Sequence, residues 1–187
     1  MGLKNGNKMR NTIILAIAMM VVMVGCQNQG KKVTEKDVKK AEEALFNEDM
    51  STNKDAVPDA VATFSQYAEQ NAEDAKAPEY LFKAFEISVN TKQDAQQSID
   101  LCNRLLTNYP EFDKNPVALF MLASFVYDEQ MHDMDKARET YQRVVDQYPN
   151  SPFANDAKIS ITQLGMTPDE LIKMFESEEK AEDRSKE

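Results

Sequence analysis

The chain has 187 residues, with 22 Lys and Arg against 32 Asp and Glu, and a formal net charge of −10. An acidic chain lacks the basic surface that binds phosphate backbones, so no nucleic-acid partner is expected. Only Gly30 and Gly165 are glycines beyond residue 25, which excludes Gly-rich phosphate loops and nucleophile elbows from that part of the chain.

The first 25 residues have the composition of a secretory signal peptide. Lys4, Lys8 and Arg10 precede an uncharged apolar run over residues 12–24. The run is about 13 residues long, whereas a membrane-spanning helix needs about 20. A basic segment followed by a short apolar run is typical of a signal peptide, so residues 1–25 are predicted to be one. Without them the chain would hold 19 basic against 32 acidic residues, a net charge of −13.

The junction Met23-Val24-Gly25-Cys26 resembles the lipobox of bacterial lipoproteins. In that family a small residue precedes a cysteine that receives a diacylglycerol and becomes the first residue after cleavage. This chain departs from the pattern at Met23, where the family usually has Leu. The resemblance implies signal cleavage between Gly25 and Cys26, lipidation of Cys26, and attachment to a membrane through that lipid. The alternative is an ordinary signal peptide followed by an incidental cysteine.

Residues 26–33 continue with polar side chains and no periodicity, so they are predicted to be a flexible tether. In enterobacterial lipoproteins an aspartate after the cysteine retains the protein at the inner membrane. This chain has Gln27 there, so the resemblance favours the periplasmic face of the outer membrane. With Cys26 lipidated, Cys102 is the remaining thiol, and no intrachain disulfide is expected.

From Thr34 on, the chain is predicted to be all-α, with about seven or eight helices. Thr34 and Asp37 have the spacing of a capping box. Prolines mark the starts of four helical patterns: Pro78, Pro116, Pro152 and Pro168. Three residues directly before such prolines are predicted to be N-caps: Asn115, Ser151 and Thr167.

An internal repeat with a period of about 36 to 39 residues indicates a repeat architecture. Residues 94–110 overlay on 133–149 without a gap, and residues 77–89 overlay on 115–127. The first overlay shares one helical stripe. In one copy the stripe is Ser98, Cys102, Leu105, Leu106 and Tyr109, followed by Pro110. In the other it is Ala137, Tyr141, Val144, Val145 and Tyr148, followed by Pro149.

These stripes resemble tetratricopeptide repeats, whose units are two antiparallel helices of roughly 34 residues. Ala137, Tyr141 and Pro149 match the small residue, aromatic and proline of the second helix, while Leu119, Leu122 and Ala123 stand in for the signature of the first. The resemblance implies an all-α solenoid of helical hairpins over residues 34–175, with about three repeats and a capping helix. The extra residues of the period are expected to lengthen the turn between the helices.

The end of the repeat resembles a narrower group. Tyr148-Pro149-Asn150-Ser151-Pro152 with its flanking residues is similar to the repeat of two envelope protein families. One is the lipoprotein of the outer-membrane β-barrel assembly machine, and the other is the periplasmic coordinator of the Tol–Pal system. The capping helix is expected to bury Leu171, Ile172 and Phe175, and residues 176–187 are predicted to be a disordered acidic tail.

No set of residues in the sequence has the pattern of a catalytic or metal site. His132 is the one histidine and is predicted to lie in a surface turn. The nearby Asp128, Glu129, Asp133 and Asp135 lack the glycine of a calcium loop, so a solvated loop is the favoured interpretation. Cys102 is predicted to be a buried structural thiol. Four methionines are expected to fill the core, with an adaptable binding surface as the alternative: Met121, Met131, Met134 and Met174.

The repeat resemblance implies a non-enzymatic scaffold that binds envelope proteins through a concave surface. The first helices, within residues 79–90 and 116–127, are expected to line it. No cofactor and no small-molecule substrate are expected. The alternative is an accessory lipoprotein of a nutrient or glycan uptake system, although the chain has no Trp and no long insertion for a sugar platform. An enzyme is disfavoured because no site can be assembled.

Overall fold

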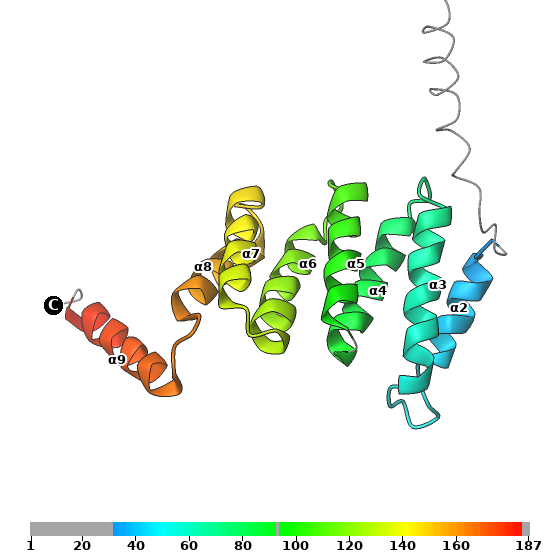
Figure 1. The fold of residues 1–187 in the computed structure, drawn as a ribbon. Coiled ribbons are helices and arrows are strands. Elements are labelled where there is room, and N and C mark those ends of the chain that lie inside the picture. The colour runs from blue at the N-terminus through cyan, green and yellow to red at the C-terminus, as the bar shows by residue number, and fades with distance from the viewer. Residues whose placement is uncertain (1–31, 93, 185–187) are drawn as a thin grey trace, which may run out of the picture. The chain divides into compact units, whose positions relative to one another are not determined.

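The computed structural model describes residues 32–92 and 94–184, which are mostly helical (Figure 1). From Val33 on, the chain forms one compact unit. The signal peptide, Gly25, Cys26 and nearly all of the tether lie outside the described residues. Among the residues described, the only β pairing is one antiparallel bridge between Phe46 and Thr52. No described helix is long and apolar enough to cross a membrane.

The helices follow one another as antiparallel hairpins. The first hairpin joins α2 (Glu35–Ala44) to α3 (Val57–Gln70), with the short 3₁₀ helix η1 (Lys54–Ala56) before α3. The second joins α4 (Ala77–Thr91) to α5 (Ala95–Asn108). In the third, α6 (Asn115–Met121) continues into the π-helical segment η2 (Leu122–Gln130) and then pairs with α7 (Met134–Gln147). Two helices follow: α8 (Pro152–Gln163) and α9 (Pro168–Arg184).

Each second helix packs against the first helix of its own hairpin and against the first helix of the next. Thus α3 contacts α2 and α4, α5 contacts α4 and α6–η2, and α7 contacts α6–η2 and α8. Figure 1 shows α3, α5 and α7 standing side by side in front of α2, α4, α6 and α8. The two kinds of helix therefore form two layers, and the core lies between them. This arrangement is the all-α hairpin solenoid that the sequence predicts.

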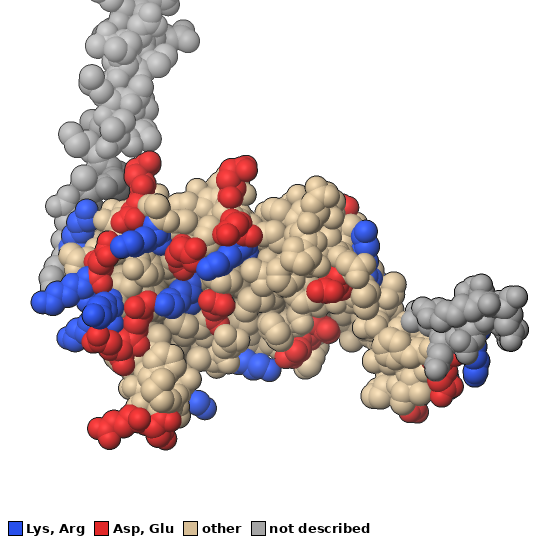
Figure 2. Space-filling model, turned by 180° about the vertical axis from the view of Figure 1, so that it is seen from behind, with Lys and Arg blue, Asp and Glu red and all other residues tan. Residues whose placement is uncertain are grey.

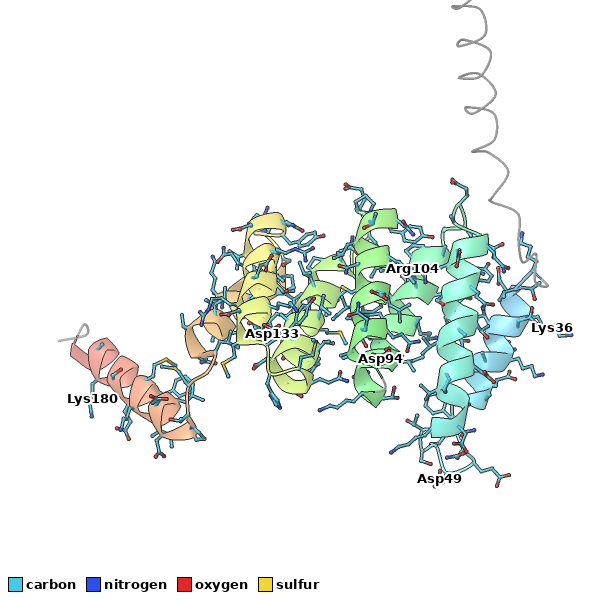
Figure 3. All side chains as sticks on the ribbon, in the orientation of Figure 1. Lys36, Asp49, Asp94, Arg104, Asp133 and Lys180 are labelled. Atoms are coloured by element: carbon cyan, nitrogen blue, oxygen red, sulfur yellow. The ribbon has the colours of Figure 1, made fainter. Side chains whose placement is uncertain are left out.

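Polar side chains set the helix starts in a repeated way. The predicted capping box is present, because the Thr34 amide donates to Asp37 Oδ2 at 2.9 Å and the Asp37 amide donates to Thr34 Oγ1 at 3.4 Å. Thr167 and Glu170 form the same pair at α9. Asp94 and Asp133 cap α5 and α7, at the same end of neighbouring hairpins (Figure 3). The amide of Lys136 donates to Asp133, which lowers the pKa of that carboxyl.

Two predicted N-caps behave differently. Asn115 is the first residue of α6, is fully buried, and Lys114 occupies the N-cap position. The N-cap prediction for Asn115 is therefore wrong, because its amide is used elsewhere, as described below. Ser151 does occupy the N-cap position of α8, but its side chain makes no capping hydrogen bond. Its buried Oγ has no partner among the described residues.

The extra residues of the period lie mainly outside the turns within the hairpins. In the second and third hairpins those turns are short, at residues 92–94 and 131–133, whereas residues 45–53 and η1 separate the two helices of the first hairpin. Longer links join successive hairpins, at 71–76 and 109–114. One more residue of the period lies within a helix. The helix formed by α6 (7 residues) and η2 (9 residues) is one residue longer than α4, which has 15. An added residue in a helix widens a turn from α to π geometry, and the Met131 amide accordingly donates to Val126 O, five residues back.

Helix α9 departs from the expectation at both of its ends. It continues to Arg184, so residues 176–184 are helical and not a disordered tail. That stretch is rich in Glu, also contains Lys, Ala and Arg, and holds no Gly or Pro, a composition that favours helix. Near its start, Ile172 and Phe175 are 56% and 52% exposed. The expected burial of these two side chains against the array is therefore not seen.

Replacement of Phe64 by Ala should test the packing of the array. Phe64 on α3 is fully buried and its ring stacks on Tyr80 with centroids 6.2 Å apart. We expect a loss of about 3–5 kcal/mol in unfolding free energy, measured by urea denaturation, because the deletion leaves a cavity. Phe175→Ala, the same change at an exposed site, should cost no more than about 0.5 kcal/mol. Equal losses in the two variants would contradict the packing described.

The thiol of Cys102 should react very slowly in the folded protein. Cys102 on α5 is fully buried, and burial raises the pKa of its thiol to about 12, although Arg143 lowers it slightly. Because the thiolate is the reactive form, labelling at pH 8 in a Cys26→Ser background should be at least about a hundredfold slower than in urea, limited by local opening. Rapid labelling of the folded protein would show that α5 is not packed as described.

Candidate functional site

The predicted repeat-packing residues fall into three groups by burial. Those at most 3% exposed are Ser98, Cys102, Leu105, Leu119, Leu122, Ala123, Ala137, Tyr141 and Val144. Those partly buried against the core are Leu106, Tyr109, Val145 and Tyr148. Pro110 and Pro149 are exposed. These two prolines therefore do not pack between hairpins. They follow the C-cap residues Tyr109 and Tyr148, and end the helices because proline cannot continue them.

A buried pair of hydroxyls, which the sequence did not reveal, joins α4 to α5. Ser88 Oγ lies 2.7 Å from Ser98 Oγ, and both residues are buried. In the overlay of the repeats, Val126 and Ala137 occupy these two places. A hydroxyl buried without a partner is costly, whereas a matched pair is tolerated. The signal in the sequence was the presence of serine in both stripes of one hairpin.

The link between the second and third hairpins is held by buried polar groups. Asn115 Nδ2 donates to the carbonyl oxygens of Tyr109 at 2.7 Å and Pro110 at 3.0 Å. The Tyr109 hydroxyl in turn donates to Ala68 O of the first hairpin at 3.3 Å. Asn115 is thus a linking residue, which explains why its side chain does not cap α6.

The face formed by the first helices is the candidate interaction surface, and its N-terminal part carries a ladder of ion pairs. Lys76 Nζ lies 2.7 Å from Glu35 Oε2, and Lys114 Nζ lies 2.6 Å from Glu79 Oε2. Lys83 on α4 pairs with Glu42 on α2. The hydrogen bonds from the two glutamates raise the pKa of Lys76 and of Lys114. Each pair joins one hairpin to the next.

The charges of the ladder on α4 are not repeated along the first helix of the third hairpin. When residues 77–89 are overlaid on 115–127, Val117, Met121 and Ser124 replace Glu79, Lys83 and Glu86, and residues 115–127 carry no charge. Figure 2, seen from behind, shows alternating blue and red side chains at one end of the molecule and a mostly tan surface toward α8. Beyond the ladder, Phe125 of η2 and Ile159 of α8 are 37% and 45% exposed.

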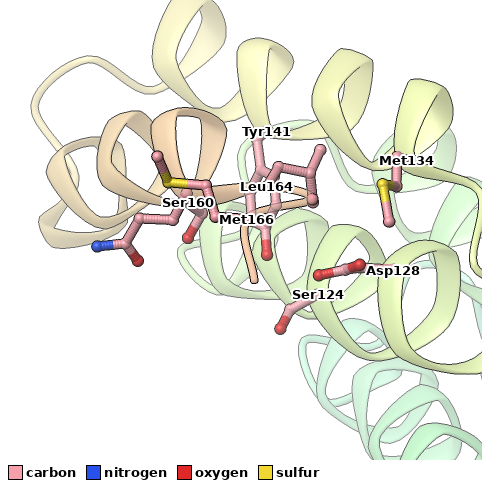
Figure 4. Close-up of a pocket in the computed structure, with 9 residues that line it drawn as sticks. Ser124, Asp128, Met134, Tyr141, Ser160, Leu164 and Met166 are labelled. Atoms are coloured by element: carbon pink, nitrogen blue, oxygen red, sulfur yellow. The ribbon is translucent and has the colours of Figure 1, made fainter. Parts of the chain in front are cut away.

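A cavity of about 410 Å³ opens between η2, α7, α8 and the link to α9 (Figure 4). Ser124 and Asp128 of η2 form one side, and Ser160 of α8 and Met166 of the link form the other. Tyr141 of α7 also lines the cavity, although only 3% of its surface is exposed. Sequence reasoning placed Tyr141 in the packing stripe but did not reveal the cavity.

His132 and two of the methionines that were candidates for metal binding or core filling lie at the protein surface. The described residues hold no group of three or more His, Cys, Asp or Glu side chains that could bind a metal. His132 is exposed in the turn after η2, where its ring Nδ1 lies 3.1 Å from Asp128 O. Met121 packs against the core, but Met131 and Met134 are 40% and 45% exposed. Core filling is therefore wrong for these two, because they lie at the turn of the third hairpin.

Comparison with known proteins supports the repeat type at the third hairpin. A family model described as the tetratricopeptide repeat matches residues 117–151, which span α6, η2 and α7 up to the start of α8. No curated protein matches the chain. Repeats of this type present extended surfaces that bind other proteins. The chain thus contains a tetratricopeptide repeat within an all-α array of helical hairpins.

Proposed function

We propose that the protein is a lipid-anchored, non-enzymatic scaffold of the bacterial cell envelope that binds another protein through its first-helix face. The binding role is supported by a change along this face from ion-paired to apolar side chains. Over α2 and α4, Glu35, Glu42, Glu79 and Lys83 form ion pairs within the array, whereas α6–η2 and α8 have exposed apolar side chains. A surface with satisfied charges and accessible apolar groups is suited to a protein partner.

The membrane attachment in this proposal rests on the lipobox resemblance at Gly25 and Cys26. Lipidation contributes about 0.8 kcal/mol per buried methylene, so that more than one acyl chain gives stable anchoring without a spanning helix. The excess of acid makes electrostatic attraction to anionic lipid unfavourable, and the acyl chains would supply the attachment. The outer membrane, and a part in an assembly or maintenance complex there, follow from Gln27 and from the resemblance to envelope repeat proteins.

The anchor can be tested by mass spectrometry of the protein purified from bacterial membranes. We expect the N-terminus at Cys26, with a mass increase for a diacylglycerol and a further acyl chain, and co-sedimentation with membranes. Cys26→Ser should abolish the added mass and the cleavage at Gly25. An unmodified Cys26 at the N-terminus, or a Cys26→Ser variant that still carries lipid, would contradict the proposal.

The binding face can be tested with a photo-crosslinking amino acid placed at single positions in living cells. Phe125 and Ile159 are exposed on first helices, and Asn103 and Glu139 are exposed on second helices. We expect defined crosslinked bands, identified by mass spectrometry, from the first pair and not from the matched second pair. Crosslinks that are as frequent from Asn103 and Glu139 would show that the first-helix face is not the binding surface.

A further inference from the structure

The cavity between η2, α7 and α8 is lined by the hydroxyl of Tyr141, a side chain that is otherwise buried. The Tyr141 ring packs against Phe120, with centroids 5.3 Å apart, and its hydroxyl projects into the cavity (Figure 4). That hydroxyl forms no hydrogen bond with the described residues. Only 3% of the surface of Tyr141 is exposed. A phenol hydroxyl in such a place gains from any donor or acceptor that enters.

Asp128 brings a negative charge to the same cavity. Its neighbours in the turn are paired: Glu129 lies 3.4 Å from Lys92 Nζ, and Asp133 lies 3.2 Å from Lys136 Nζ. Within the described part of the chain, the half-buried carboxylate of Asp128 has no ion pair. Its backbone oxygen accepts from the His132 amide at 3.2 Å, which holds the turn in place without using the carboxylate.

The remaining walls combine hydroxyl groups with thioethers. Ser124 and Ser160 supply oxygens, and Met134 and Met166 supply flexible apolar surface. Gly165 keeps the link close to Met134, since its φ is +83° and an added Cβ would lie 3.0 Å from Met134 Sδ. Two similar cavities have a cation beside their acids: Arg104 with Asp94 and Asp100 lines one, and Lys40 with Asp37 and Asp59 lines the other. No cation lines this one.

We propose that this cavity, referred to as the Tyr141 pocket, receives an arginine side chain of the partner protein. An apolar occupant would leave Asp128 and the Tyr141 hydroxyl without partners, which is unfavourable. An anion would meet the Asp128 charge. Arginine satisfies both requirements, because its five N–H donors can reach several oxygens while its aliphatic stem packs on the methionines. The proposal rests on the proposed binding role of the first-helix face and adds a partner chemistry to it.

The test uses methionine-methyl NMR on the full chain, purified in detergent micelles. The probes are three short peptides, each with one central residue: arginine, its uncharged isostere citrulline, or glutamate. The methyl signals of Met134 and Met166, assigned with Met→Leu variants, report on the pocket. We expect them to shift in a saturable way with the arginine peptide, and about tenfold higher concentrations to be needed with citrulline.

Two variants separate the pocket from general attraction to an acidic protein. Asp128→Asn and Tyr141→Phe should each weaken the arginine response at least about fivefold, and Tyr141→Phe keeps the ring that packs on Phe120. Asp156→Asn is the matched control, since Asp156 is exposed on α8 and does not line the pocket. It should leave the response unchanged. Unperturbed signals from Met121 would show that the variants remain folded.

Several outcomes would overturn the proposal. These are no shift at Met134 and Met166, equal responses to arginine and citrulline, or an equal loss in Asp156→Asn and Asp128→Asn. Concentration-dependent shifts without peptide would instead indicate a second copy of this chain as the occupant. Because the peptides are added to purified protein, a negative result leaves the crosslinking at Phe125 and Ile159 intact, so failure of the pocket and failure of the binding face are distinguishable.

Discussion

Each second helix buries one stripe of side chains between two first helices, and the whole array depends on this contact. In α7 the stripe contains Ala137, Tyr141 and Val144, all at most 3% exposed, and it faces both α6–η2 and α8. A small residue at the crossing lets the helices approach closely, while the larger residues fill the space beside it. The stability of such an array is the sum of the stability of each hairpin and the energy of each interface between neighbouring hairpins. Loss of one stripe therefore affects two interfaces at once.

The polar groups inside the array follow from the same constraint. Where the crossing of α4 and α5 uses Ser98 in place of alanine, Ser88 supplies the hydrogen bond that the buried hydroxyl requires. Where the chain passes from α5 to α6, Asn115 satisfies the carbonyl oxygens of the link. These groups fix how one hairpin follows the next, a task that apolar packing alone performs less specifically.

The sequence was sufficient for the parts of the fold that depend on periodicity. The hairpins, the packing stripes and the caps of Thr34 and Thr167 follow from 3.6-residue spacing and local hydrogen bonding. Two features could not be derived in this way. Asn115 has the composition of a cap, but a buried site at the hairpin link uses its amide. The long helix α9 is governed by the helix-forming residues after Phe175, which outweigh their high charge.

The Tyr141 pocket was missed for a geometric reason. A helical wheel with 3.6 residues per turn assumes α geometry throughout residues 115–130, but Leu122–Gln130 is π-helical. A widened turn rotates every later side chain about the helix axis, so the direction of Asp128 cannot be read from its distance in sequence to Leu119 or Leu122. The added residue therefore accounts for an acid that faces a cavity. The charge ladder ends for a different reason, because uncharged residues replace Glu79, Lys83 and Glu86.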